Sequence, residues 1–213
     1  MIRVKVCGLS DPSNVKEVVE AKPEFIGFIF YPLSPRYVGK ETVTGIFQNI
    51  PAGIKKAGVF INETSKKILE TAAIANLDII QLHGSESAEL CSQLKSSGLE
   101  VIKAFSINTD FCFDSMVQYL QVCDYFLFDT KSEKAGGSGR KFDWKKLDDY
   151  SLDKPFFLSG GIGPEDIIKL KTIRNKGLFA VDINSRFETA PGIKDVRQVS
   201  AFIKELKMVG YDI

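Results

Sequence analysis

The chain has 213 residues, 44% of them hydrophobic, and its 28 basic and 27 acidic side chains leave a formal net charge of +1. A chain of this length builds one hydrophobic core, and its balanced charge gives no electrostatic reason to expect nucleic acid or an acidic membrane as a partner. No apolar run approaches the roughly 20 residues that span a bilayer, so no membrane segment is expected. The N-terminal sequence MIRVKVCG is typical of a first strand and not of a signal peptide, which indicates a cytoplasmic protein.

The cysteines and the histidine limit the chemistry. The four cysteines form no CxxC pair, and without a secretory signal we interpret them as free thiols. The single histidine, His83, counts against metal sites that need several imidazoles, and no metal site is expected. Chemistry near neutral pH is therefore expected to depend on carboxylates, a thiol or a lysine.

Short apolar runs with the character of strands alternate with segments of helical spacing. Strands are predicted to begin near Arg3, Phe25, Lys56, Asp78, Glu100, Asp124, Pro155 and Leu178. Helices are predicted at residues 11–21, 64–75, 85–94, 164–173 and 195–206, the first with Asp11 as N-cap and Pro12 at its first position. The segment 108–122 is poorly patterned, so we expect a short or irregular helix there.

Eight strands that alternate with helices indicate a parallel sheet, and eight is the number that closes a (β/α)₈ barrel. An open doubly wound sheet is the competing fold. The glycine-rich loops lie late in the chain, and none forms a dinucleotide-binding fingerprint after the first strand, which favours the barrel. We therefore predict a single (β/α)₈ TIM-barrel domain over residues 1–213.

Reactive and polar residues gather where the predicted strands end, which is where barrel enzymes build their active sites. These positions include Cys7, Arg36, Asn62, His83, Asp129, Ser159 and Asp182. Strand alternation places Lys5 on the same side as Cys7, and Leu127 on the same side as Asp129. A thiol and two carboxylates are therefore predicted to converge at the mouth of the barrel.

Two late loops are typical of phosphate binding. Residues 159–166 (SGGIGPED) connect the seventh strand to a helix, and residues 182–186 (DINSR) follow the eighth strand. A Gly-Gly pair alone is also consistent with tight packing of a helix, but the two loops together favour phosphate. The glycine-rich residues 136–139 are interpreted instead as a flexible wall beside Asp129.

The ordered set of motifs resembles phosphoribosylanthranilate isomerases over essentially the entire chain. The motifs are residues 5–8 (KVCG), 27–30 (GFIF), 34–38 (SPRYV), 58–62 (GVFIN), 81–84 (QLHG), 129–130 (DT), 136–139 (GGSG), 142–144 (FDW), 159–161 (SGG), 181–185 (VDINS) and 191–195 (PGIKD). The resemblance implies an Amadori rearrangement of N-(5-phosphoribosyl)anthranilate in tryptophan biosynthesis, without cofactor or metal. It implies a small phosphosugar substrate as the partner, and a monomer is the default because no long exposed apolar face is visible.

By resemblance, Cys7 is the general base and Asp129 the general acid. Arg36 would contact the anthranilate part, and Asp182 would position the substrate near the reacting amine. The expected phosphate-binding residues are Gly160, Gly161, Asn184 and Ser185. His83 is interpreted as a packed or hydrogen-bonded residue of the rim that contributes to substrate binding, in preference to a catalyst.

Three residues depart from the pattern of the family. We expect a glycine and a small aliphatic residue at Arg186 and Phe187, and Asn is common at Asp166, which is expected to lie outside the reacting centre. Arg186 would either contact the phosphate or point to solvent. The alternative functions are another phosphosugar enzyme of this fold and a non-catalytic phosphosugar-binding protein. The single histidine disfavours metal-dependent epimerases, Cys7 disfavours a two-carboxylate sugar isomerase, and the presence of both acid and base disfavours a binding protein.

Overall fold

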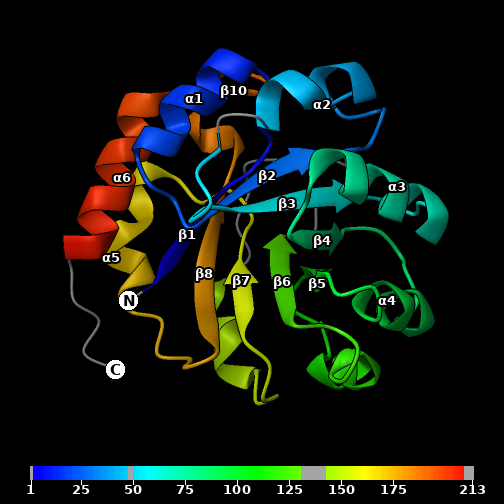
Figure 1. Cartoon of the computed structure of the whole chain (residues 1–213). Helices are drawn as coiled ribbons and strands as arrows, with labels where there is room; N and C mark the ends of the chain where they lie inside the picture. Colours follow the sequence, from blue (N-terminus) through cyan, green and yellow to red (C-terminus); the bar gives the residue numbers. More distant parts are fainter. Residues whose placement is uncertain (1, 48–49, 131–142, 209–213) are drawn as a thin grey trace.

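Eight parallel strands close into a barrel that helices surround (Figure 1). The computed structural model describes residues 2–47, 50–130 and 143–208. The strands are β1 (Arg3–Val6), β2 (Phe25–Ile29), β3 (Lys55–Phe60), β4 (Ile79–Leu82), β5 (Glu100–Ile107), β6 (Tyr125–Thr130), β7 (Phe156–Leu158) and β8 (Leu178–Ile183). Each strand pairs with the next in sequence, and β8 pairs with β1. The predicted barrel is confirmed, and every strand begins within one residue of its predicted start.

The α-helices lie on the outside of the barrel, as the strand–helix alternation predicts. They are α1 (Pro12–Glu20), α2 (Lys40–Phe47), α3 (Ser65–Ala75), α4 (Ala88–Lys95), α5 (Ile167–Leu170) and α6 (Val196–Met208). The side chain of Asp11 accepts a hydrogen bond of 2.7 Å from the backbone N–H of Asn14, so Asp11 is the N-cap of α1. In the described part of the chain, none of the helices has the length and apolarity needed to cross a membrane.

The later connections are less regular than the early ones. The expected irregular segment contains a 3₁₀-helix at Phe113–Tyr119. The helix predicted at 164–173 is instead a 3₁₀ turn, Pro164–Asp166, followed by the four-residue α5. The carboxylate of Asp166 accepts a hydrogen bond of 2.7 Å from the backbone N–H of Gly163, and this bond stabilises the start of the 3₁₀ turn. That prediction was too long because helical spacing alone does not distinguish a 3₁₀ turn from an α-helix.

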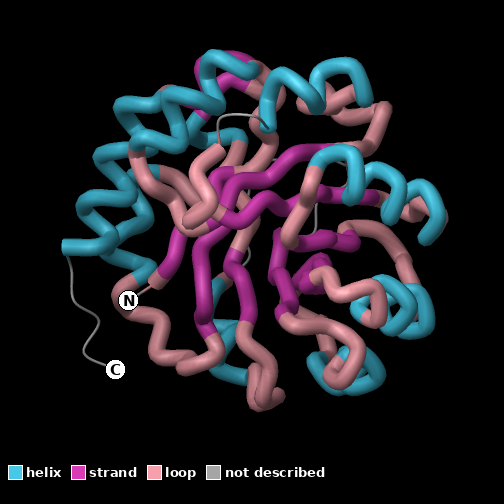
Figure 2. Tube along the Cα trace, viewed as in Figure 1, coloured by secondary structure: helices cyan, strands magenta, loops and turns pink. Residues whose placement is uncertain are grey.

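The hydrophobic core has two layers, which reflect the alternation of side chains along each strand. The inner layer fills the barrel with Phe25, Ala57, Ile79, Ile102, Ala104, Leu127, Phe157 and Ala180. The outer layer, which includes Val4, Val6, Phe126 and Phe128, packs between the strands and the helices. Figure 2 shows the barrel strands inside the surrounding helices. Since Val4 and Val6 face outward, Lys5 and Cys7 point into the barrel, as predicted.

A short hairpin after β8 is attached to the first helix. Its strands are β9 (Glu188–Ala190) and β10 (Ile193–Lys194). The buried side chain of Asn14 in α1 donates to the carbonyl of Lys194 at 2.9 Å and accepts from its N–H at 2.7 Å. This paired contact fixes the backbone of the hairpin at Lys194 relative to α1.

Candidate active site

Cys7, Lys5 and Asp182 form a buried polar group inside the barrel. Lys5 and Asp182 lie opposite each other on β1 and β8, and the Lys5 Nζ donates to Asp182 Oδ2 at 2.9 Å. Cys7 directly follows β1 on the same side as Lys5, and the charge of Lys5 acts on the pKa of its thiol. Room for the sulfur comes from Gly27, because a Cβ there would lie 2.6 Å from Cys7 Sγ.

The electrostatics of this group follow from its burial. Burial raises the pKa of the Cys7 thiol, and the Lys5 ammonium lowers it by a smaller amount. Burial lowers the pKa of Lys5, but the charges of Asp182 and Cys7 raise it by more, so Lys5 is a cation. Burial also raises the pKa of Asp182 despite Lys5. Asp182 Oδ1 is buried and has no hydrogen-bond partner among the described residues, so it is available to a ligand's donor.

Asp129, the predicted acid, lies at the end of β6 in contact with His83. Its Oδ2 is 3.2 Å from His83 Nε2, and its Oδ1 accepts from the backbone N–H of Thr130 at 2.8 Å. Behind the imidazole, Gln81 Nε2 is 2.9 Å from His83 Nδ1. The structure therefore places His83 beside the carboxylate at the rim, as a hydrogen-bonded partner of Asp129.

Arg36 lies against the residue that follows Cys7. Gly8 has a positive φ of 75°, and a Cβ on it would lie 2.7 Å from Arg36 Cδ. The guanidinium makes a two-point contact with Glu188, with Nε to Oε1 at 2.8 Å and Nη2 to Oε2 at 2.6 Å. Lys194 Nζ adds a hydrogen bond to Glu188 Oε1 at 2.6 Å. The hydrogen bonds that Arg36 donates to Glu188 raise the pKa of Arg36.

Sequence reasoning missed Glu188 and Lys194. Lys194 lies inside one of the motifs that resemble the family (PGIKD), but no role was assigned to it. Glu188 lies in the hairpin, 152 residues from its partner Arg36, and no periodic pattern indicates such a pair. The available signal was weak, because Glu188 and Lys194 are only two of the four charged residues in the segment 184–195 that follows β8.

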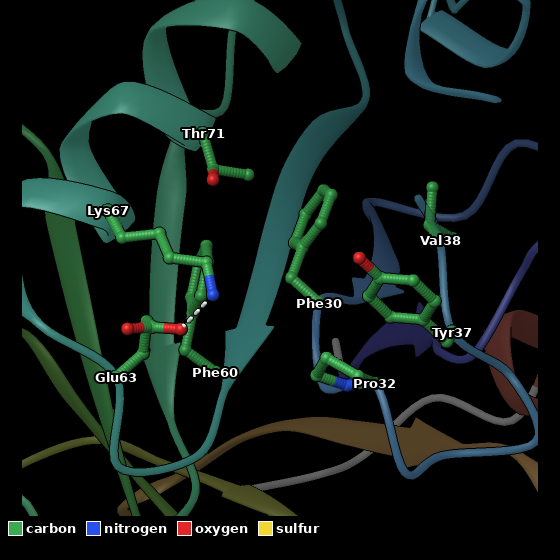
Figure 3. Close-up of a pocket in the computed structure, with 8 residues that line it drawn as sticks. All are labelled: Phe30, Pro32, Tyr37, Val38, Phe60, Glu63, Lys67 and Thr71. Atoms are coloured by element: carbon green, nitrogen blue, oxygen red, sulfur yellow. Dashed lines mark ion pairs between the residues drawn. The ribbon is translucent and has the colours of Figure 1, made fainter. Parts of the chain in front are cut away.

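The loop that carries Arg36 also forms a wall of an apolar pocket on the outer side of the barrel (Figure 3). The pocket is lined by Phe30, Pro32, Tyr37, Val38, Phe60, Glu63, Lys67 and Thr71. Tyr37 forms a backbone bridge with Ile29, and Val38 is buried. The pocket contains none of the predicted site residues. Its packing holds the loop that presents Arg36.

The loop after β7 lies directly against Asp129. Gly160 and Gly161 have positive φ values of 94° and 72°, a conformation that favours glycine. A Cβ on Gly160 would lie 2.6 Å from the N of Thr130 and 3.0 Å from Asp129 Oδ1. The glycine therefore lets the loop approach the carboxylate closely.

The loop after β8 contains the two other predicted phosphate residues. Asn184 Oδ1 accepts a hydrogen bond of 2.6 Å from Lys194 Nζ, so this side chain is directed toward Lys194. Ser185 begins a 3₁₀ turn that ends at Phe187. The structure thus brings the loops of β7 and β8 to the same end of the barrel, while the predicted glycine wall at 136–139 lies outside the described residues.

The two unusual residues of this loop have clear structural roles. Arg186 Nη2 donates to Glu165 Oε1 at 2.8 Å, and both side chains are about half exposed. The pair connects the β8 loop with the turn after β7. Phe187 is fully buried, and its ring packs edge-on against Phe202 of α6, with centroids 5.0 Å apart. Neither side chain disturbs the approach of Gly160 to Asp129.

Taken together, the barrel and its strand ends define a class of protein: a (β/α)₈ barrel with a thiol, a lysine and two carboxylates beside two late loops of the kind that bind phosphate. The family model for N-(5'phosphoribosyl)anthranilate (PRA) isomerase matches residues 4–205. The chain belongs to this family.

Individual relatives agree with the family match over nearly the full chain. N-(5'-phosphoribosyl)anthranilate isomerase from Parabacteroides distasonis is 42% identical over 207 residues, covering 95% of this chain and 92% of the relative. The crystal structure of phosphoribosyl anthranilate isomerase from Thermotoga maritima is 35% identical with a TM-score of 0.84, and the match covers 98% of this chain and 100% of that one.

Two further crystal structures describe binding and assembly in relatives. An isomerase in complex with reduced 1-(o-carboxyphenylamino)-1-deoxyribulose 5-phosphate is 33% identical with a TM-score of 0.80, again covering 98% and 100%. A structure described as monomers of the dimeric Thermotoga maritima enzyme is 32% identical with a TM-score of 0.84, with the same coverage.

Proposed function

We propose that this chain isomerises N-(5'-phosphoribosyl)anthranilate to 1-(2-carboxyphenylamino)-1-deoxyribulose 5-phosphate in tryptophan biosynthesis. The observation that carries the proposal is the buried group of Cys7, Lys5 and Asp182, which lies at the same barrel end as Asp129 in a member of the isomerase family. The proposed location is the cytoplasm, where free thiols such as Cys7 stay reduced.

Asp129 is the proposed general acid. Its carboxyl proton goes to the ribose ring oxygen, the bond from C1' to that oxygen breaks, and the nitrogen lone pair forms an iminium. His83 supports this role because its Nε2 contacts Asp129 Oδ2 at 3.2 Å and orients the carboxyl group. Thr130 orients the other oxygen through its backbone N–H.

Cys7 is the proposed general base. Its thiolate removes the C2' proton of the iminium, and the resulting enolamine tautomerises to the ketone, so the proton given by Asp129 is balanced by the one taken by Cys7. Free thiols have a pKa of about 8.5, and burial raises that of Cys7, so a nearby cation is needed. Lys5 is the largest such influence and Lys194 a smaller one.

The remaining site residues are proposed to bind the substrate. Arg36 would bind the carboxylate of the anthranilate ring, and the unpartnered Asp182 Oδ1 would accept the N–H of the reacting amine. The phosphate would lie on the backbone amides of Gly160, Gly161, Asn184 and Ser185. Backbone amides are favoured for Asn184 because its side-chain oxygen is already bound to Lys194.

A direct assay tests this function. The purified protein is incubated with freshly made phosphoribosylanthranilate, and the loss of the anthranilate fluorescence of the substrate is followed over time. We expect turnover that persists when a metal chelator is present. A protein that is folded by circular dichroism but gives no turnover would exclude the proposed function.

We also propose that the chain is a monomer. In the described part of the chain, the five most exposed large apolar residues lie in separate segments: Leu33, Ile74, Val117, Ile168 and Met208. Scattered exposed apolar side chains are normal on monomers. Light scattering of the purified protein measures the mass directly. A dimer, as described for the Thermotoga maritima enzyme, would contradict this proposal.

A further inference from the structure

Glu188 is a buried carboxylate with an unusually complete set of donors. Its side chain is only 5% exposed. Oε1 accepts from Arg36 Nε at 2.8 Å, from Lys194 Nζ at 2.6 Å and from the backbone N–H of Gly192 at 3.1 Å, and Oε2 accepts from Arg36 Nη2 at 2.6 Å. Two-point contacts between arginine and a carboxylate fix the plane of the guanidinium as well as its position.

The contact with Glu188 uses the Nε–Nη2 edge of the Arg36 guanidinium and leaves the Nη1 side free. Nε and Nη2 are bound to Glu188, whereas Nη1 has no hydrogen-bond partner in the described ranges. The side chain of Arg36 passes over Gly8, next to Cys7, and is 9% exposed. The available guanidinium N–H groups therefore lie beside the proposed base.

The charges of this cluster are unbalanced. With Arg36 and Lys194 protonated and Glu188 ionised, two positive charges surround one negative charge. While Cys7 is a neutral thiol, one positive charge remains uncompensated in a nearly buried position, and an added anion would neutralise it. A carboxylate is planar and matches the free edge of a guanidinium.

We propose that Glu188 is a positioning residue that holds Arg36 in the orientation needed to bind the ring carboxylate of the substrate, with Lys194 holding Glu188 in place. This inference deepens the proposed function and rests on it. The hairpin explains why the arrangement is rigid, since Asn14 binds the backbone of Lys194 from α1 at two points. Glu188 acts through Arg36 and does not itself contact the substrate.

A role of Glu188 as a competitor of the substrate would change KM in the opposite direction. If Glu188 merely competed with the substrate for Arg36, its removal would free the guanidinium, increase the positive charge and lower KM. If Glu188 positions Arg36, its removal leaves a long flexible side chain that must be ordered on binding, and KM rises. The direction of the change in KM thus separates the two roles.

The test is Glu188→Gln, which preserves size and removes the charge. We expect KM for phosphoribosylanthranilate to rise at least about tenfold, with kcat changed by less than about twofold. The second substrate is N-(5'-phosphoribosyl)aniline, which lacks the ring carboxylate. Its KM should be the same in the variant and the wild type. A lower KM for phosphoribosylanthranilate, or an equal rise in KM for both substrates, would overturn the proposal.

A double-variant experiment tests whether Glu188 acts through Arg36. In an Arg36→Ala background, Glu188→Gln should produce no further rise in KM. A further rise comparable with that in the wild type would overturn the inference. The matched control is Glu100→Gln, which removes the partner of Lys55 at the opposite end of the barrel and should leave KM unchanged.

A more conservative variant covers the case in which Glu188→Gln does not fold. Glu188→Asp retains the charge but is one methylene too short to reach both Nε and Nη2. We expect its KM for phosphoribosylanthranilate to rise, by less than in Glu188→Gln, and its KM for phosphoribosylaniline to stay unchanged. An unchanged KM in folded Glu188→Asp would count against the two-point contact. Absence of turnover in the wild type would instead reject the proposed function, so the two failures are distinguishable.

Discussion

Two opposing electrostatic influences act on the pKa of the Cys7 thiol. Burial makes the thiolate costly, whereas the ammonium of Lys5 stabilises it from the same face of β1. Lys5 is in turn held by Asp182, whose other oxygen has no partner in the described part of the chain. The base therefore depends on its neighbours for its protonation state.

Removing the proposed base or acid should reduce the chemical step. Cys7→Ala and Asp129→Asn are each expected to lower kcat by about 10²–10⁴ with little change in KM, because general acid–base groups act mainly in the transition state. Steady-state kinetics measures both constants. Cys112→Ala, at an exposed cysteine, is the control and should retain full activity. A near-normal kcat in either site variant would remove that residue from its role.

Replacing Lys5 should change the pH dependence. The base works when deprotonated, so activity rises as the pH approaches the pKa of Cys7 from below. Lys5→Met removes the largest influence that lowers this pKa, so the pKa rises and the pH–rate profile moves to higher pH. Activity at neutral pH should fall by about tenfold for each pKa unit and recover at higher pH. An unmoved profile in a folded variant would show that Lys5 does not tune Cys7.

At the residue level, strand alternation was sufficient to place some side chains but not others. It correctly placed Lys5 and Cys7 inside the barrel, because Lys5 lies on β1 and Cys7 directly follows it, so the period of two still applies. It could not indicate that Glu188 binds Arg36, because both residues lie outside the barrel strands. Contacts between loops depend on the tertiary fold, which a local pattern does not contain.

Among the elements, the strands were predicted better than the helices. Apolar runs bounded by turn residues locate the first residue of each strand to within one position, because both faces of each strand are buried. The late helical segments are short and partly 3₁₀, and their ends depend on side-chain contacts such as that of Asp166 with Gly163. Arg186 and Phe187 show the same limit, since their partners Glu165 and Phe202 come from other elements.

The β7 loop should tolerate no side chain at Gly160. In Gly160→Ala, the new Cβ would contact Thr130 and Asp129, and the positive φ adds backbone strain. We expect lower stability and a kcat reduced by at least about tenfold, because the acid is displaced. Gly98→Ala is the matched control, since Gly98 has a φ of 87° but nothing within 4 Å of its added Cβ. Equal losses of activity in the two variants would show that strain alone is responsible.

On the scale of the whole molecule, the barrel closes where β8 meets β1, and the Lys5–Asp182 pair crosses that junction. Asp182→Leu would leave a fully buried ammonium without its carboxylate, which should cost about 3–5 kcal/mol in the free energy of unfolding. The double variant Lys5→Met/Asp182→Leu should recover most of this loss. Urea unfolding measures the free energy of unfolding of the single and the double variant.

The partly exposed pair Lys55–Glu100 provides the comparison for that experiment. Glu100→Gln should cost at most about 1 kcal/mol, because solvent screens exposed ion pairs. If Asp182→Leu costs no more than this control, the closure of the barrel does not depend on the buried pair.

The contact of Arg36 with Glu188 has a consequence for biosynthesis of the chain. The ribosome makes Cys7 and Arg36 early, and the partner carboxylate follows 152 residues later. At about 5–20 residues per second, that interval is on the order of 10 s. A nascent chain without β8 and its hairpin lacks Asp182, Glu188 and Lys194, and therefore three of the six charged residues of the site, the other three being Lys5, Arg36 and Asp129. Substrate binding is thus a property that the polypeptide acquires only near the end of its translation.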